Sequence, residues 1–232
     1  MTKLRAVSRP GPLRVEIASA IKELIVRGGF KFNQHLVESE LASQLGVSRL
    51  PVREALQDLS RDGWVDLKVG YGAFVHTPSA REIDEVFSVR CALESEAAFQ
   101  AAERVRDQET DEDEIETLRA ILEVGSAEAS HGVDTEIVDH NAQLHSAIIH
   151  LSGNQVLSEM TAAIEARVRW YFSAIAVTRA PASWEEHGGV VEAILRGEPE
   201  LAKTLMAAHC ERSRKGLLNL PNIAEGPSTV QD

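Results

Sequence analysis

Residues 46–58 read GVSRLPVREALQD, and this stretch decides the fold of the first part of the chain. Gly46 stands where a chain can turn sharply, because glycine readily adopts a positive φ. Ser48 is a good N-cap, and Pro51 follows in the first turn of a helix, where a missing N–H costs nothing. The stretch therefore predicts a turn and then a helix that begins directly after Ser48.

The apolar and basic residues of this helix lie on different faces. Its inward stripe consists of Val52, Leu56 and Leu59. Arg49, Arg53 and Gln57 are spaced by four on another face. An arginine at the N-terminal end of such a helix can bond guanine O6 and N7 together or hold phosphates. The alternative is that both arginines are ordinary solvent-exposed residues of the helix or pair with Asp58 and Asp62.

Two helices are expected before this one. Apolar residues keep helical spacing from Leu13 to Ile25, between a Pro-Gly-Pro break and Gly28-Gly29. Residues 36–46, LVESELASQLG, predict a second, short helix that ends at Gly46. Two short helices joined at a glycine form the helix-turn-helix outline.

A small hairpin is predicted within residues 61–78, RDGWVDLKVGYGAFVHTP. Apolar and polar residues alternate over 65–67 and again over 73–75, with turn residues between them. A hairpin after a helix-turn-helix is a wing. Its tip carries Lys68 and Gly70, which suit a loop that lies along a phosphate backbone or enters a minor groove.

Amino-acid composition and the spacing of apolar residues predict that the rest of the chain is helical. Aromatic residues make up 5% of the 232 residues, and long helical patterns follow a short linker near residue 78. Breaks are expected at 106–113, 129–136, 151–154, 178–183 and 195–200. We therefore expect a mainly α protein in which a winged helix-turn-helix (13–77) precedes an all-α bundle of six or seven helices (79–218). Residues 1–12 read as a basic arm and 219–232 as a disordered tail.

Charge is divided unevenly along the chain. Residues 1–78 carry 11 Lys and Arg against 8 Asp and Glu, whereas the whole chain has a net charge of −12. One part facing a polyanion and another that does not would explain this asymmetry, although solvated surface charge could also produce it. Cys91 and Cys210 have no spacing typical of a disulfide scaffold or a thiolate metal site. Without an export signal or a long apolar run, we expect a cytoplasmic protein.

Three histidines lie on different predicted helices among small or apolar neighbours: His145, His187 and His209. Asn141 precedes His145 by four residues and so shares its helix face. Three imidazoles and an oxygen make a plausible site for a divalent metal. From pattern alone the spacing is too loose to assign a metal site, and ordinary core or surface histidines are the favoured interpretation.

Residues 36–75, LVESELASQLGVSRLPVREALQDLSRDGWVDLKVGYGAFV, closely resemble the winged-helix domain of the GntR family of bacterial transcription regulators. The resemblance implies that Arg49 and Arg53 contact operator DNA. It places beside them Ser48, Leu50 and Pro51, with Gly70 at the wing tip. Some members have an arginine where this chain has Ser39, so one DNA contact of the family can be missing here.

Residues 79–218 resemble the helical FCD branch of that family, named for its fatty-acid-responsive member FadR. The resemblance rests on VRCALE, NAQLHSAIIHLSGN, EEHGGVVEAILRGEPELA and MAAH. It implies a metal site formed by Asn141, His145, His187 and His209, where Asn141 replaces the usual aspartate. We expect zinc or nickel, with manganese as the alternative.

The same resemblance implies a small organic-acid effector held by the metal and an arginine. Arg90 in VRCALE is the first candidate, and Arg167 and Arg169 are the others. The alternative for Arg90 is an intrahelical pair with Glu94.

These features together predict a metabolite-responsive repressor that binds a palindromic operator as a homodimer. One rival is a metal-dependent hydrolase that uses the three histidines. The sequence has no HExxH motif, and neither Glu185 nor Glu186 shares a helix face with His187. The other rival is a regulator that responds only to protein partners.

Overall fold

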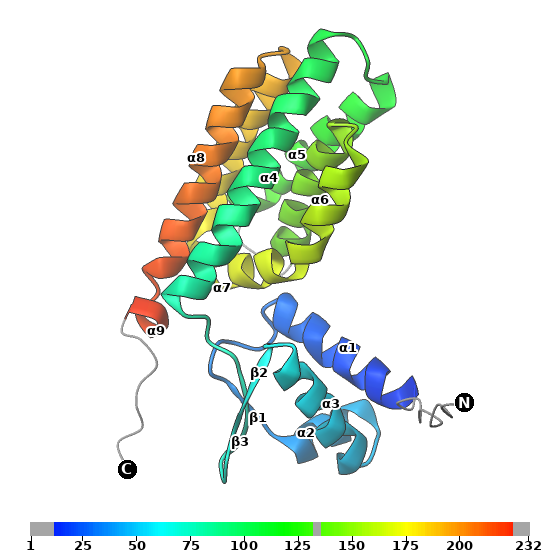
Figure 1. Cartoon of the computed structure of the whole chain (residues 1–232), viewed down its shortest axis with the longest axis vertical. Helices are drawn as coiled ribbons and strands as arrows, with labels where there is room; N and C mark the ends of the chain where they lie inside the picture. The colour runs from blue at the N-terminus through cyan, green and yellow to red at the C-terminus, as the bar shows by residue number, and fades with distance from the viewer. Residues whose placement is uncertain (1–11, 132–135, 225–232) are drawn as a thin grey trace, which may run out of the picture. The chain divides into compact units, whose positions relative to one another are not determined.

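The computed structural model describes residues 12–131 and 136–224 (Figure 1). The chain forms two compact units, one built from residues up to 25 with 29–76, and one from 26–28 with residue 77 onward. The first holds a winged helix-turn-helix and the second a helical bundle, so the expected mainly α fold is confirmed. The predicted basic arm lies outside the described residues, apart from Pro12.

Three helices form the body of the first unit: α1 (Pro12–Val26), α2 (Glu38–Leu45) and α3 (Arg49–Arg61). Gly46 ends α2 with φ 67°, and its N–H bonds the carbonyl oxygens of Ala42 and Ser43. An L side chain is strained in this conformation, which is why the turn into α3 requires glycine. The predicted inward stripe of α3, Val52, Leu56 and Leu59, is buried together with Ile17, Ile21 and Ile25 of α1.

The wing belongs to a three-stranded antiparallel sheet of order β1-β3-β2. The hairpin strands are β2 (Val65–Lys68) and β3 (Gly72–Val75), and Val65 faces Val75 in their register. Gly70 lies at the tip with φ 80°. The sequence did not predict β1 (His35–Leu36), because two residues are too few to show an alternating pattern.

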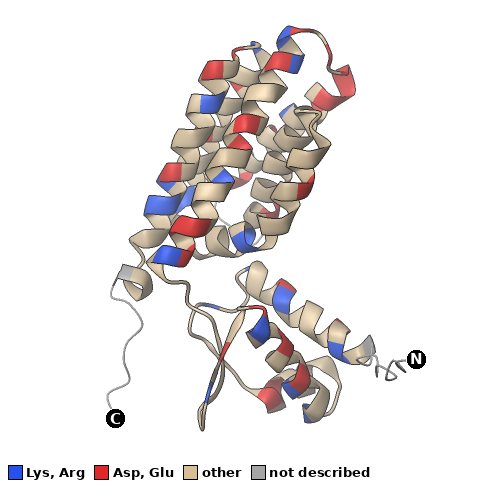
Figure 2. Ribbon diagram, viewed as in Figure 1, with Lys and Arg blue, Asp and Glu red and all other residues tan. Residues whose placement is uncertain are grey.

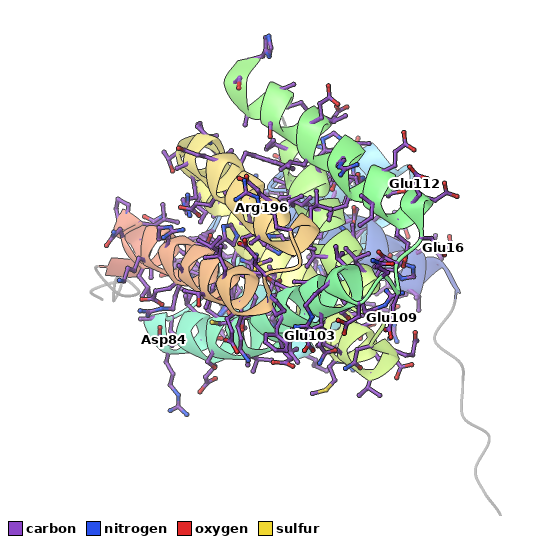
Figure 3. The ribbon with its side chains drawn as sticks, turned by 90° about the horizontal axis from the view of Figure 1, so that it is seen from above. Glu16, Asp84, Glu103, Glu109, Glu112 and Arg196 are labelled. Carbon is purple, nitrogen blue, oxygen red and sulfur yellow. The ribbon has the colours of Figure 1, made fainter. Side chains whose placement is uncertain are left out.

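The second unit is a bundle of long helices. Its described residues form α4 (Ala80–Arg106), α5 (Glu112–His131), α6 (Glu136–Leu151), α7 (Gln155–Leu195), α8 (Pro199–Leu218) and the short α9 (Pro221–Ala224). Helices α4, α7 and α8 pack side by side (Figure 1). Figure 3 looks onto the end of the bundle where α4 carries Glu103, the following loop carries Glu109 and α5 begins at Glu112.

Two expectations for this unit are wrong. Helix α7 runs without interruption through residues 178–183, with Pro181 inside it. A proline removes one helical hydrogen bond and usually kinks a helix. Here Ala180, Ser183 and Trp184 beside it are all buried, and this packing offsets the loss. In the predicted tail, residues 221–224 form α9, and residues 225–232 lie outside the described part of the chain.

Acidic residues are spread over the helices of the second unit (Figure 2). Over the described ranges, no helix combines the length and apolarity needed to cross a membrane. Cys91 is half-buried and Cys210 buried, and both are free thiols.

Candidate functional site

The N-terminal end of α3 is open to solvent. Ser48 occupies the N-cap position with φ −77° and ψ 164°, but its hydroxyl makes no capping hydrogen bond. Leu50 is 63% exposed, and the side chains of Arg49 and Arg53 are 63% and 54% exposed. Pro51 sits in the first turn, as predicted. These side chains are accessible to a large ligand without any rearrangement of the core.

Both arginines bond Glu38, which the sequence pattern did not single out. Arg53 donates from Nε and Nη2 to the two carboxylate oxygens of Glu38, each at 2.8 Å, and Arg49 Nη2 donates to Oε2 at 3.4 Å. The hydrogen bond from Arg53 lowers the pKa of Glu38, against the opposing effect of burial. Asp58, a suggested partner, instead pairs with Arg14 at 2.8 Å and with Arg61.

The wing tip presents its predicted residues beside this surface. Lys68 Nζ donates to Asn33 Oδ1 at 3.2 Å and lies 4.3 Å from the centre of the Phe74 ring. A groove of about 330 Å³ runs between α3 and the wing. Residues from both sides line it, among them Glu38, Arg53, Gln57, Lys68 and Gly70.

The three predicted histidines meet inside the second unit. His145 on α6, His187 on α7 and His209 on α8 each offer a nitrogen, and these three atoms lie within 4.8 Å of one another. The two Nε2 atoms of His187 and His209 are 3.3 Å apart. Burial, with the neighbouring charged groups, lowers the pKa of His187 and of His209 well below the usual value. Both imidazoles are therefore neutral near pH 7, the form that binds metal ions.

Asn141 adds an oxygen to this cluster's surroundings. It lies one turn before His145 on α6 and is 2% exposed. Its Oδ1 is buried and has no hydrogen-bond partner among the described residues. A buried polar atom without a partner costs roughly 1–3 kcal/mol, and a cation would satisfy it. The donor set, three imidazoles and one neutral oxygen, thus fits a divalent metal ion.

A carboxylate orients one of these histidines. His209 Nδ1 donates to Oε2 of Glu186 at 3.0 Å, which leaves Nε2 as the ligand atom. Glu186 also accepts from Arg179 and Arg212. The sequence showed that Glu186 does not share a face with His187, but contact with a histidine of another helix cannot be deduced from spacing.

Arg90 and Glu94 form a buried pair beside His145. Arg90 Nε lies 3.0 Å from both oxygens of Glu94, and its Nη2 lies 3.1 Å from Nε2 of His145. Glu94 Oε2 lies 2.9 Å from Nδ1 of His145, although the groups are not aligned as a hydrogen bond, so this contact is electrostatic. Burial raises the pKa of Glu94, but Arg90 and His145 outweigh it and lower that pKa. The intrahelical pair is present, and Arg90 also contacts the histidine cluster.

A small cavity of about 90 Å³ opens next to the cluster. Its wall includes Glu94, Asn141, His145 and Arg169, but not Arg167. Arg169 donates to Asp139. Of the three candidate effector-binding arginines, the geometry therefore brings Arg90 to the histidines and Arg169 to the cavity.

Comparisons with known proteins agree with both halves of this description. The family model "Bacterial regulatory proteins, gntR family" matches residues 13–75, and the model "FCD domain" matches residues 85–212. YdhC of Bacillus subtilis, described as an uncharacterised HTH-type transcriptional regulator, is 29% identical over 206 residues, 88% of this chain and 90% of YdhC.

Two further proteins are similar over much of the chain. The Nta operon transcriptional regulator of Aminobacter aminovorans is 32% identical over 143 residues, 61% of this chain and 64% of that protein. The solved structure of McbR/YncC of Escherichia coli matches with a TM-score of 0.70 and 23% identity, covering 94% of this chain and 100% of the other. At that identity the structural match supports the fold alone.

Proposed function

The chain belongs to the GntR family of bacterial regulatory proteins and carries an FCD domain, and from this premise we propose that it is a metabolite-responsive repressor of transcription. The family and the relatives above are transcriptional regulators and not enzymes, so the alternative of a metal-dependent hydrolase has no support.

We assign DNA binding to the exposed N-terminal end of α3 and to the wing. The observation that carries this proposal is the pair Arg49 and Arg53, exposed at the N-terminus of a helix that follows a glycine turn. Their guanidinium groups suit guanine edges and phosphates. Leu50 and Pro51 lie beside them on α3, and Ser48 precedes them at the N-cap position. Lys68 and Gly70 extend the surface along the wing.

Mobility-shift assays with genomic fragments test this half of the proposal. Wild type should retain specific fragments at physiological salt, and Arg49→Ala with Arg53→Ala should lose them. Arg61→Ala is the matched control, because Arg61 is an exposed arginine at the far end of the same helix. Equal loss with the control, or no specific fragment with wild type, would contradict the proposal.

We infer a divalent metal ion at Asn141, His145, His187 and His209, with zinc or nickel preferred over manganese. The support is the three buried imidazoles and the buried Oδ1 of Asn141, which has no hydrogen-bond partner among the described residues. Such an ion supplies a Lewis-acidic positive centre that can hold an anionic ligand. His145 Nε2 accepts from Arg90, so that nitrogen becomes a ligand only if this hydrogen bond is given up.

Metal content after gentle purification tests the site. Wild type should contain close to one ion per chain, and His187→Ala should contain little. His140→Ala is the control, because His140 lies on α6 but bonds Glu128 instead of joining the cluster. Equally low metal in wild type and His187→Ala would contradict the assignment.

The effector in this proposal is a small organic acid held by the metal and an arginine. Arg90, which contacts His145, and Arg169, which lines the cavity, are the first candidates, and Arg167 is not among the residues that line the cavity. A thermal-shift screen of organic and sugar acids, with and without zinc, nickel and manganese, should find a compound that stabilises the chain. The same compound should release DNA. A complete absence of stabilisation would favour the rival that responds only to protein partners.

The repressor is proposed to act as a homodimer on a palindromic operator, since two copies of α3 then meet two half-sites. Sedimentation of the chain with and without a selected duplex checks this point. A single chain per duplex would contradict it.

A further inference from the structure

Glu38 is the common partner of both arginines that are proposed to read DNA. We propose that Glu38 is a specificity-determining residue of the DNA-binding surface: it orients Arg53 for base contact and cancels charge that would otherwise attract any phosphate backbone. This inference rests on the proposed DNA binding. It assigns a role to an acidic residue on a surface whose other named contacts are basic or neutral.

The geometry of the pair leaves the reading edge of Arg53 open. A guanidinium has five N–H donors, and Glu38 takes one from Nε and one from Nη2. The remaining donors include those at the end of the fork, on Nη1 and Nη2. Those are the donors that bond O6 and N7 of a guanine together. Glu38 therefore fixes the plane of the guanidinium without occupying the edge that would meet a base.

The position of Glu38 in the fold makes this support rigid. It is the first residue of α2, where the backbone is held by the helix, and its side chain is 24% exposed, far less than those of the two arginines. A carboxylate in the first turn also interacts favourably with the helix dipole. Holding Arg53 before DNA arrives reduces the rotamer freedom that its side chain must lose on binding.

The charge of Glu38 matters as much as its reach. Two arginines around one carboxylate present a net charge of one instead of two. Affinity for DNA of any sequence depends on the number of phosphates neutralised, whereas base contacts alone distinguish sequences. Glu38 and Arg53 both line the groove shared with the wing residues Lys68 and Gly70, so this carboxylate faces the proposed DNA side.

A structural tie between α2 and α3 is the competing explanation. Such a tie predicts that removing the carboxylate lowers stability and weakens binding to every duplex in proportion. The proposed role predicts a change in the ratio of two affinities, which a loss of active protein cannot produce.

The test compares Glu38→Gln with Glu40→Gln in the full chain. Glu40 also lies in the first turn of α2 and is exposed, and among the described residues its side chain makes no ion pair. Both variants remove one negative charge from the same turn. Two probes are used: the duplex that wild type enriches most strongly from a random library, and a scrambled duplex of equal length. Binding is followed by fluorescence anisotropy over a range of salt concentrations.

Glu38→Gln should bind the scrambled duplex more tightly than wild type, with a log–log salt dependence steeper by about 1. The ratio of its affinities for the two duplexes should fall about fivefold or more, because a misoriented fork loses part of a bidentate contact. Glu40→Gln should leave that ratio within about twofold of wild type. Glu38→Asp keeps the charge but shortens the reach, so its ratio should fall without tighter binding to the scrambled duplex.

An unchanged ratio in Glu38→Gln, with or without a lower melting temperature, would overturn the inference and leave the structural tie. The same holds if Glu40→Gln changes the ratio as much as Glu38→Gln. If wild type enriches no sequence at all, the proposed DNA binding fails, and this inference fails with it. Enrichment by wild type together with an unchanged ratio in Glu38→Gln overturns this inference alone.

Discussion

The buried pair Arg90–Glu94 should be a strong determinant of the stability of the helical bundle. Its side chains are 1% and 4% exposed, and Arg90 Nε lies 3.0 Å from both carboxylate oxygens. Removing one partner of such a pair leaves an uncompensated buried charge, which costs about 3–5 kcal/mol. Glu94→Gln should therefore lower the free energy of unfolding by that amount, and the melting temperature by roughly 6–20 °C for a unit of this size.

The same helix provides a control with identical spacing. Arg81 and Glu85 on α4 also form an i,i+4 pair, but their side chains are 87% and 61% exposed. Glu85→Gln should leave the free energy of unfolding almost unchanged, because exposed pairs are screened by water. Urea denaturation followed by circular dichroism measures both variants. A cost below about 1 kcal/mol for Glu94→Gln would refute the view that Arg90 depends on this carboxylate for its buried charge.

Three further outcomes follow from the geometry. The pKa of His187 and of His209 in the folded chain is lowered below the unfolded value of 6.5, so the unfolded chain binds more protons at pH values near and below 6.5. Denaturation in chelator should therefore show the free energy of unfolding falling as the pH drops below about 6.5. A rise instead would contradict the buried neutral state. Asn141→Asp should tighten zinc binding in a competition titration and lower stability in chelator, since the new charge lies where Oδ1 has no partner within 12–131 and 136–224. Unchanged zinc affinity would argue against Asn141 as a ligand. Gly46→Ala should lower the free energy of unfolding by about 1 kcal/mol in urea denaturation, because Gly46 has φ 67°. Gly188→Ala should instead stabilise the chain by about 0.5–1 kcal/mol, because Gly188 lies within α7 and has open space around it. Equal effects of the two variants would contradict the strained turn at Gly46.

Local pattern predicted most of the first unit. The stripe of α3, the turn at Gly46 and the wing strands each follow from residues close together in sequence. The strand β1 escaped prediction because its pairing with β3 depends on residues 37 and 39 positions away. Pro181 misled the prediction for α7, because a proline is a strong local signal and the packing that outweighs it is tertiary.

The candidate sites, too, could be predicted only in part from local sequence. The sequence suggested three histidines on three helices, but only the packing of the helices shows that their ligand atoms lie within 4.8 Å of one another. Sequence reasoning missed the roles of Glu186 and Glu38 because each contacts a residue of a different helix, His209 and Arg53 respectively. The periodicity of one helix does not indicate such a contact. The pair Arg90–Glu94, in contrast, could be suggested from sequence, because its residues are four positions apart on one helix.

The central claim is that the N-terminal end of α3 reads DNA sequence through its arginines. The most direct measurement is to select duplexes from a random library with wild type and with Arg53→Ala, and to compare the enriched sequences. Wild type should enrich a motif with a guanine in each half-site, and Arg53→Ala should lose the preference at that guanine while keeping the rest, at a cost of about 1–3 kcal/mol in affinity. The same motif enriched with the same preference by both proteins would contradict the claim.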